Sequence, residues 1–427
     1  MMIPSLRAWI CAVLLLCMLP AAAQQHRSAA AVAALEANID RAGGNTHAYE
    51  FAPLHDTKPP KGFKPFYISH YGRHGSRSDW SGPYYRELIR ILEEAGRIGI
   101  LTPEGDSLLA ETRLVNDAHA GMDGRLSQRG VREHAQLAER MYRRYPEVFR
   151  KGSTHVRSIS SIGQRCLISM AAFTTRLDEC AGGRLDFYWD NGETFQYVVS
   201  NDASKETRQK SQRLIDSLDR SFIQDSVQIK ERLFTNPVEA RKLIPDIFVF
   251  ERMIFQTAKI AKGCDIDRNI FRHLPFDVIY KWWELDNFDL YIRHCNSVEF
   301  GLERMPLTEP LVRDIVEKAD EAISQGNWAA DLRFGHDNPL VATASYLGLE
   351  GVGDRWNASE VSEHWWAFEM VPFAANLQLV FYRNKAGDVL VKFLYNEQET
   401  LVRGLTPVEG PYYRWSDVRE NIKGYLR

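Results

Sequence analysis

The chain has few features of a metal centre, a membrane protein or a nucleic-acid binder. Its 427 residues include only 6 cysteines, none with the spacing of a metal-ligand pair. The 53 basic and 56 acidic residues give a net charge of −3, so no overall field attracts nucleic acid or phosphate esters. After the first residues, no stretch stays apolar for the roughly 20 residues that a membrane-spanning helix requires. These absences favour a soluble protein without stable membrane insertion or a nucleic-acid partner.

Residues 1–23 predict a signal peptide. Arg7 gives a positive start, Ala8–Leu19 is a short apolar run, and Pro20–Ala23 before Gln24 is typical of a cleavage site. We therefore expect an exported protein, periplasmic in a Gram-negative bacterium and otherwise secreted. Cleavage removes one basic residue, so the mature chain would carry 52 basic and 56 acidic residues, a net charge of −4. Any anion site must then be a local cluster of basic side chains.

Four cysteines remain after the predicted cleavage: Cys166, Cys180, Cys264 and Cys295. They allow three pairings if all are oxidised. Cys166 and Cys180 fall on one predicted helix, about 21 Å apart along its axis. A disulfide spans at most about 7 Å between Cα atoms, so these two cannot pair. Cys264 with Cys295 is the pairing that we expect first.

A dense basic motif follows the first predicted strand. The apolar segment Pro65–Ser69 leads into Tyr71-Gly-Arg-His-Gly-Ser-Arg77. Arg73 and Arg77 each present a planar fork of donors that fits phosphate oxygens. His74 stands between them, and the flanking glycines let the backbone approach an anion closely. Such close cationic groups repel one another unless an anion or carboxylates compensate, so the motif indicates phosphoryl-transfer chemistry.

The basic motif is one of three strand-to-helix corners, in which a short strand ends and a charged group stands at the turn into a helix. Two later segments have the same form. One is the predicted strand His155–Ile159, which carries Arg157 and is followed by Arg165 at the head of the next helix. The other is His336-Asp337, before a predicted helix. Taken singly, Asp337 is typical of a helix cap. Arg157 or Arg165 alone is typical of a solvated or salt-bridged residue. In open α/β sheets ligands bind beyond the carboxyl ends of strands, so we expect the three corners to converge on one phosphate.

Strand and helix patterns alternate on both sides of a helical block. Residues 24–185 and 326–427 predict an α/β core of three layers with a mainly parallel sheet. The second part includes a hairpin pattern, Asn376–Arg383 and Asp388–Leu394, on either side of a turn. Residues 186–325 have charged helical periodicity and few strand signals, which predicts an inserted, mostly α-helical cap domain.

With these motifs the chain resembles the histidine acid phosphatases, the larger branch of the histidine phosphatase superfamily, which includes phytases. The family signature is Arg-His-Gly-x-Arg-x-Pro near the start and His-Asp near the end, and the corresponding segments here are Arg73–Asp79 and His336-Asp337. Asp79 stands where the family usually has proline. Arg157 and Arg165 are further apart than the family's two middle arginines. The His-Asp pair resembles the acid phosphatase and phytase side, since a related inositol-polyphosphate phosphatase group carries His-Ala-Glu.

The resemblance implies an acid phosphatase that hydrolyses a small phosphomonoester through a phosphohistidine. His74 would attack phosphorus, and Asp337 would protonate the leaving alkoxide. A phosphate dianion beside Asp337 should raise the pKa of that carboxyl, which predicts an acidic pH optimum. We expect no metal and no cofactor, because arginines would neutralise the charge. The implied phosphate-binding residues are Arg73, Arg77, Arg165 and His336, with Arg157 as the alternative middle arginine.

Three other functions fit part of the pattern. A catalytically silent phosphate- or glycan-binding protein would keep the basic pocket, but binding alone requires neither His74 nor Asp337. A phosphoglycerate-mutase-like transferase shares Arg-His-Gly, but the export signal and the late His-Asp count against it. A metallohydrolase would use the histidines as ligands and would lose activity in EDTA. Release of a chromogenic alcohol from its phosphomonoester separates an enzyme from a binding protein.

The motifs recognise only phosphate, so the organic part of a substrate must be selected elsewhere. The aromatic run Tyr280–Trp283 fits helix packing better than a pocket lining. The single sequon Asn357–Ser359 would matter only in a eukaryote. Four basic residues of the helical block offer contacts to a polyphosphorylated ring such as phytate, although a solvated helix face explains them as well: Lys205, Arg208, Lys210 and Arg213.

Overall fold

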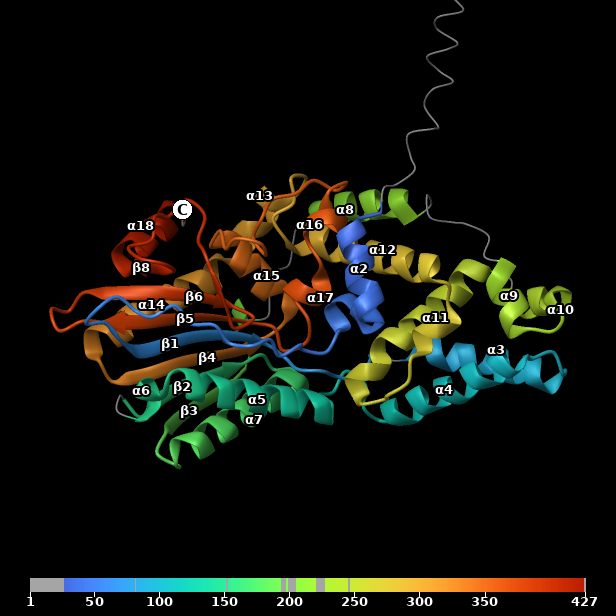
Figure 1. Cartoon of the computed structure of the whole chain (residues 1–427), viewed down its shortest axis with the longest axis horizontal. Helices are drawn as coiled ribbons and strands as arrows, with labels where there is room; N and C mark the ends of the chain where they lie inside the picture. The colour runs from blue at the N-terminus through green and yellow to red at the C-terminus, as the bar shows by residue number, and fades with distance from the viewer. Residues whose placement is uncertain are drawn as a thin grey trace, which may run out of the picture.

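The structure is a computed structural model that describes residues 27–80, 82–150, 153–192, 197–198, 205–219, 227–244 and 246–425. One half is built around a β-sheet and the other half is built of helices (Figure 1). The predicted signal peptide, residues 1–23, lies outside the described residues. Among the helices that are described, none combines the length and the apolar character needed to cross a membrane.

One mixed sheet contains all the named strands, in the order β3-β2-β4-β1-β5-β6-β7, with β8 beside β6. The first four strands in this order are parallel, and β5 to β8 each run antiparallel to their neighbours. Because β1 lies between β4 and β5, its carboxyl end lies in the middle of the sheet edge. The strands are β1 (Lys64–Arg73), β2 (His155–Ser160), β3 (Asp186–Asn191), β4 (Trp328–Gly335), β5 (Asn376–Arg383), β6 (Val389–Tyr395), β7 (Gln398–Thr400) and β8 (Tyr412–Arg414).

Alternation along the strands divides the apolar side chains between two faces of the sheet. On β1, Tyr67 and Tyr71 pack into one hydrophobic cluster and Ile68 packs into the other. Helices cover both faces, which confirms the predicted α/β class and its three layers (Figure 1). On one face lie α5 (Gln128–Arg144), α6 (Pro146–Arg150) and α7 (Gln164–Ala181), and on the other α14 (Glu309–Gln325), α15 (Asp337–Tyr346) and α18 (Trp415–Tyr425).

The other helical elements lie mostly beyond one end of the sheet (Figure 1). α3 and α4 precede residue 186, yet they pack against each other and against α11 in the helical half. β3 lies within 186–325, yet it pairs with β2 in the sheet. The predicted boundaries of the cap domain stay a prediction. The elements are α2 (Ala29–Ala37), η1 (Ile39–Thr46), α3 (Pro83–Arg97), α4 (Pro103–His119), α8 (Lys205–Asp219), α9 (Val227–Leu233), α10 (Pro237–Leu243), α11 (Ile247–Ala261), η4 (Lys262–Cys264), η5 (Ile270–His273), α12 (Phe276–His294), α13 (Gly301–Arg304), η6 (Met305–Thr308), α16 (Val361–His364) and α17 (Ala367–Met370).

The aromatic run and the basic residues of the helical block have separate environments. Tyr280, Trp282 and Trp283 on α12 are buried in the larger hydrophobic cluster, which confirms the helix-packing interpretation. The four basic side chains of α8 are exposed, as on a solvated helix face, and one of them, Lys210, pairs with Glu206.

The predicted disulfide between Cys264 and Cys295 is wrong, because both residues are free cysteines. Cys264 Sγ lies 3.6 Å from Nε2 of His119. Cys295 is fully buried at the end of α12. Burial raises the pKa of both thiols, that of Cys264 to about 12, so neither is a thiolate at neutral pH.

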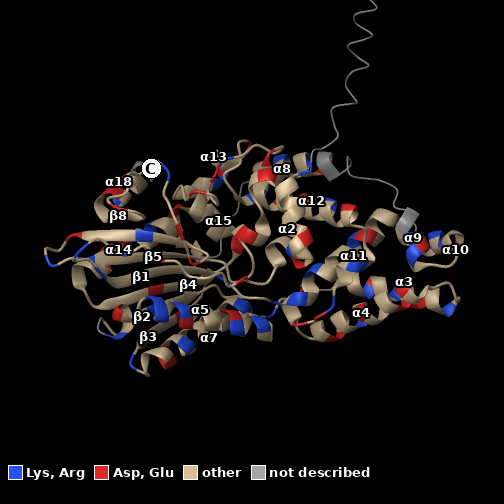
Figure 2. Ribbon diagram, viewed as in Figure 1, with Lys and Arg blue, Asp and Glu red and all other residues tan. Residues whose placement is uncertain are grey.

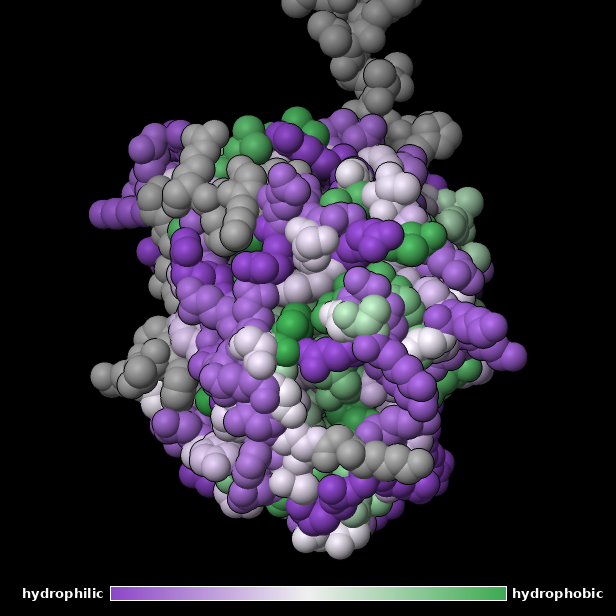
Figure 3. Space-filling model, turned by 90° about the vertical axis from the view of Figure 1, so that its left-hand side faces the viewer, coloured by the Kyte–Doolittle hydropathy of each residue, from purple (hydrophilic) through white to green (hydrophobic). Residues whose placement is uncertain are grey.

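Charges of both signs are interspersed along the helices of both halves (Figure 2). The face seen in Figure 3 is mainly hydrophilic, with hydrophobic side chains scattered among polar ones. The interspersed charges agree with the small net charge of −3. An anion must therefore be attracted by a local cluster of basic groups.

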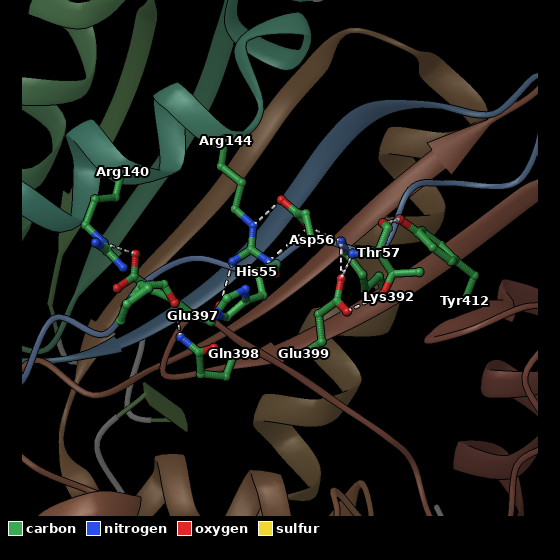
Figure 4. A network of polar contacts seen from close by, with 11 residues as sticks. His55, Asp56, Thr57, Arg140, Arg144, Lys392, Glu397, Gln398, Glu399 and Tyr412 are labelled. Carbon is green, nitrogen blue, oxygen red and sulfur yellow. Dashed lines mark hydrogen bonds and ion pairs between the residues drawn. The ribbon is translucent and has the colours of Figure 1, made fainter.

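A polar network attaches the N-terminal arm, residues 27–63 before β1, to the antiparallel part of the sheet (Figure 4). Lys392 on β6 is fully buried, and its ammonium group contacts Asp56 and, at 2.8 Å, Glu399. Arg144 on α5 reaches the same Asp56 carboxylate at 2.7 Å. Glu399 also accepts hydrogen bonds from the backbone and hydroxyl groups of Thr57, at 2.9 and 2.7 Å. The arm is thus held by ion pairs to a fully buried lysine and a nearly buried arginine.

We expect Lys392→Met to lower the free energy of unfolding by about 3 kcal/mol, because it leaves two carboxylates without their buried cation. This loss of stability is at the low end of the range for breaking a buried ion pair, since Asp56 is 39% exposed and keeps its contact with Arg144. Denaturant unfolding measures the loss, with Lys385→Met in the exposed hairpin turn as the matched control. Equal effects of the two substitutions would contradict the role of the network.

Candidate active site

Two neighbouring parallel strands end where the candidate site begins. In the register of β1 and β4, Arg73 pairs with Gly335, so His74 and His336 follow the two strand ends side by side. The backbone N–H of His74 donates to the Gly335 carbonyl at 2.9 Å, and the two imidazole rings lie 5.6 Å apart between centroids. The helices α7 and α15 begin at the same edge and bring Arg165 and Asp337.

His74 is almost completely buried, with 3% of its surface exposed. Its Nδ1 lies 2.9 Å from the carbonyl oxygen of Gly75. Because a carbonyl only accepts, Nδ1 carries the proton and the lone pair is on Nε2. Burial, followed by Arg73, Arg165 and Arg77, lowers the pKa of His74 well below its ordinary value. The ring is therefore a neutral imidazole with its lone pair on Nε2.

Arg73 is a buried guanidinium held from several sides. It donates through Nη1 to the carbonyl oxygens of Asn45 and Val371, the latter at 2.7 Å. Its Nη2 lies 3.0 Å from Asp337 Oδ2, and its Cζ lies 4.8 Å from the ring centroid of Phe373. These contacts fix the plane of the guanidinium beside the His74 ring.

Asp337 is the first residue of α15 and lies against Arg73. Its Oδ1 accepts from the backbone N–H of Asn338 at 3.0 Å, and its Oδ2 accepts from Asn45 Nδ2 at 3.0 Å. Burial alone would raise the pKa of this carboxyl, but Arg73, then His294 and His336, hold it below its ordinary value. Asp337 is therefore ionised when no anion is bound.

His336 and Arg165 form a second pair at the site. Arg165 Nη2 lies 3.3 Å from Nδ1 of His336, and His336 Nε2 lies 3.1 Å from Ser161 Oγ. Since a guanidinium only donates, Nδ1 accepts and the His336 proton is on Nε2. Burial, then the charge of Arg165, lowers the pKa of His336 to about 4. This histidine is neutral in the empty site at pH 7.

Arg77 completes the cluster of three guanidinium groups. It donates through Nη1 to the Ser78 carbonyl at 2.7 Å, and Asp79 Oδ1 is 4.0 Å away. Burial, followed by repulsion from Arg73 and Arg165, lowers the pKa of Arg77 to about 10. Burial and the neighbouring Arg165 likewise lower the pKa of Arg73. With Asp337 as the only carboxylate within 3 Å of the cluster among the pairs described, these guanidinium groups favour binding of an anion.

The loop after β1 is held by close packing on α5. A Cβ on Gly75 would lie 2.7 Å from the backbone of Gly130, and one on Gly130 would lie 2.3 Å from the Ser76 carbonyl oxygen. Glu133, one turn further on, accepts from the backbone N–H and the hydroxyl of Ser76, both at 2.7 Å. Glycine at both positions is therefore required for the loop to reach this depth.

Arg157 is the predicted residue that the structure does not bring to the cluster. It pairs with Asp331 across β2 and β4 and with Glu321 on α14, at 2.5 and 2.8 Å. Its ladder position corresponds to Ser69 on β1, four residues and roughly 13 Å before Arg73. Of the two predicted middle arginines, the structure therefore places Arg165, and not Arg157, beside His336.

Several residues near the cluster had no signal in the sequence. Asn45 comes from η1 in the N-terminal arm, Phe373 follows α17, and Ser161 directly follows β2. Asn45 and Phe373 lie far from the motifs along the chain, so only long-range packing places them there, whereas Ser161 lies between Arg157 and Arg165. Among the described residues, no group of three His, Cys, Asp or Glu side chains is arranged to hold a metal ion.

Comparison with solved structures shows that the fold is phytase-like. The apo multiple inositol polyphosphate phosphatase of Bifidobacterium longum aligns with a TM-score of 0.74 and 19% identity, over 90% of this chain and 97% of that chain. The same protein in complex with inositol hexasulfate gives 0.73 and 18%, over 90% and 97%. The phytase from D. castellii gives 0.64 and 12%, over 91% and 85%. No family model and no curated protein matches the sequence.

These similarities confirm the fold that the resemblance implies. The class that they define is one of fold, which this chain shares with the phytase from D. castellii. Within it, the multiple inositol polyphosphate phosphatase of B. longum is similar over nearly its whole length.

Proposed function

We propose that the chain is an exported phosphomonoesterase of the histidine acid phosphatase type. The observation that carries the proposal is the neutral His74, whose lone pair on Nε2 stands among the guanidinium groups of Arg73, Arg77 and Arg165. Such a group is a good nucleophile only toward an electrophile that the arginines also bind, and a phosphoryl group meets both conditions.

The proposed reaction has two steps at one phosphorus atom. His74 Nε2 attacks phosphorus, the P–O bond to the alcohol breaks, and the leaving alkoxide takes a proton from Asp337. Water then attacks the phosphohistidine, the P–N bond breaks, and the Asp337 carboxylate takes the proton from that water. The three arginines neutralise charge on the phosphoryl oxygens in both steps. A bound dianion would also raise the pKa of His336, so the protonated ring adds a further donor.

The proton on Asp337 must arrive with the substrate, because Arg73 keeps this carboxyl ionised in the empty site. A phosphomonoester monoanion carries one proton up to its second pKa, about 6. Transfer of that proton to Asp337 gives the dianion beside a neutral acid, which is the arrangement that the first step needs. The reactive species is therefore the substrate monoanion with the ionised enzyme.

We expect kcat/KM to be highest at acidic pH and to decline above about pH 6, where the free substrate loses its second proton. At pH values well below 6.5, kcat/KM should stay high, since the lowered pKa of His74 leaves the nucleophile neutral there. A profile with a chromogenic phosphomonoester from pH 3 to 8 measures both limbs. An acidic limb centred near 6.5, the ordinary histidine value, would contradict this account of His74.

The same assay tests the proposed function itself. Release of the chromogenic alcohol in the presence of EDTA supports a metal-independent phosphatase. Absence of release at every pH from 3 to 8, with inorganic phosphate still bound, would favour a phosphate-binding protein. A hydrolysis panel of sugar phosphates, nucleotides and inositol hexakisphosphate identifies the substrate. Inositol phosphates are the first candidates, because the similar solved structures include an inositol polyphosphate phosphatase and a phytase.

A further inference from the structure

Trp80 is a large apolar side chain left 53% exposed beside the arginine cluster. The chain around it is held by backbone contacts to residues 122–126. Ser78 N–H donates to the Arg125 carbonyl at 3.0 Å, and Gly124 N–H donates to the Asp79 carbonyl at 2.8 Å. The backbone N–H of Trp80 itself donates to Asp79 Oδ1 at 2.9 Å. The exposed indole is therefore fixed at its base.

The indole ring lies against two of the three guanidinium groups. Arg77 Cζ is 5.3 Å and Arg165 Cζ is 4.6 Å from its centroid. These arginines come from different elements, the loop after β1 and the start of α7, and their like charges repel. The negative face of an aromatic ring attracts cations without carrying a charge of its own.

The way in which an arginine is held decides what it can still bind. Arg157 lies 4.0 Å from the ring centroid of Trp328 and still donates through Nε, Nη1 and Nη2 to Asp331 and Glu321, so the carboxylates and not the ring occupy its donors. A ring beneath the guanidinium plane takes none of these donors. Arg77 and Arg165 can thus be oriented by Trp80 and still donate to phosphoryl oxygens. A carboxylate in place of Trp80 would instead compete with the phosphate for the same donors.

We propose that Trp80 is a positioning residue, which holds Arg77 and Arg165 side by side with N–H groups available to the phosphoryl group. The inference rests on the proposed function, since it concerns how the same site binds phosphate. Trp80 touches the arginines and takes no part in the bond changes. Its contribution should appear as affinity for phosphate, measurable without turnover.

The first test compares Trp80→Leu with Trp80→Phe by calorimetric titration of inorganic phosphate. Leucine keeps apolar bulk and removes the ring, so we expect the Kd to rise about tenfold for two lost cation–π contacts. Phenylalanine keeps a ring, so its Kd should stay within about threefold of the unmodified protein. Trp189→Leu, at a tryptophan 60% exposed on β3, is the matched control and should bind phosphate normally.

A second pair of variants moves the indole without replacing it. Gly121 and Gly124 both have positive φ, 71° and 63°, so alanine strains the backbone similarly at either position. A Cβ on Gly124 would lie 2.8 Å from the Trp80 ring, whereas one on Gly121 would meet nothing within 4 Å. We expect Gly124→Ala to weaken phosphate binding several-fold more than Gly121→Ala.

The outcomes separate the inference from the proposed function. If the unmodified protein neither binds phosphate nor releases alcohol from a phosphomonoester, the proposed function is wrong. If it does both, and Trp80→Leu binds phosphate as tightly as Trp80→Phe, then the positioning role is wrong and the function stands. Equal phosphate binding by the two glycine variants would overturn the role by a second route, independent of any substitution at Trp80.

Discussion

Replacement of His74 by alanine is expected to lower phosphomonoesterase turnover by at least about a thousandfold, because it removes the only atom proposed to bond with phosphorus. Alanine leaves the guanidinium groups of Arg73, Arg77 and Arg165 in place, so inorganic phosphate should still bind. Loss of kcat with phosphate affinity retained is the expected pattern. Steady-state kinetics and phosphate titration on the same preparation measure the two quantities.

Two further observations make the His74 test specific. His364→Ala is the matched control, since this ring stacks on Trp356 at 4.0 Å between centroids. It should leave kcat unchanged. Rapid quenching of the unmodified protein with a labelled phosphomonoester should trap phosphate on His74 through an acid-labile P–N bond. Turnover by His74→Ala within tenfold of the unmodified protein, or label on another residue, would exclude His74 as the nucleophile.

Asp337→Asn is expected to slow alkyl phosphates by about a hundredfold or more, the size of a lost general acid. Phenols leave without full protonation, so an aryl phosphate should slow by less than about tenfold. The asparagine has nearly the same shape and can still accept from Asn45, although it no longer neutralises Arg73. The ratio of kcat/KM for the two substrate classes is therefore the quantity to compare.

The change in that ratio distinguishes proton donation from charge balance. If Asp337 only neutralises Arg73, both substrate classes should change by the same factor. Asp354→Asn, at a carboxylate that pairs with Arg403 outside the cluster, should leave the ratio and both rates unchanged. A substrate-independent loss in Asp337→Asn would remove the acid role and leave the nucleophilic role of His74 standing.

Local features of the fold could be predicted from the sequence because they depend on neighbouring residues. Thr102 and Ser127 are residue types that favour helix starts, and each caps its helix by accepting a hydrogen bond from the N–H three residues on. The expected hairpin is present as β5 and β6. The first strand, expected over the apolar residues up to Ser69, continues to Arg73. Its polar end is held as a strand by pairing with β4 and β5 on both sides, which no local pattern shows.

The candidate site also has a part that could be predicted from the sequence and a part that could not. The two motifs could be found because arginine, histidine and aspartate have few reasons to cluster at strand ends other than binding an anion. The choice of Arg165 over Arg157 depended on sheet register, since Asp331 lies opposite Arg157. The disulfide prediction failed for a related reason, because cysteine spacing carries no information on whether two thiols meet.

By itself the sequence determined the α/β class and the basic loop around His74, since these follow from periodicity and from the chemistry of a short motif, and its two signature segments carried the resemblance to phytases. Only the tertiary structure decided which atoms of that loop are available. The Gly75 carbonyl places the His74 proton on Nδ1, Arg73 keeps Asp337 ionised, and Trp80 packs against two arginines. Each of these depends on burial and on contacts between residues that the chain separates, and charge interactions become strong only where folding has excluded water.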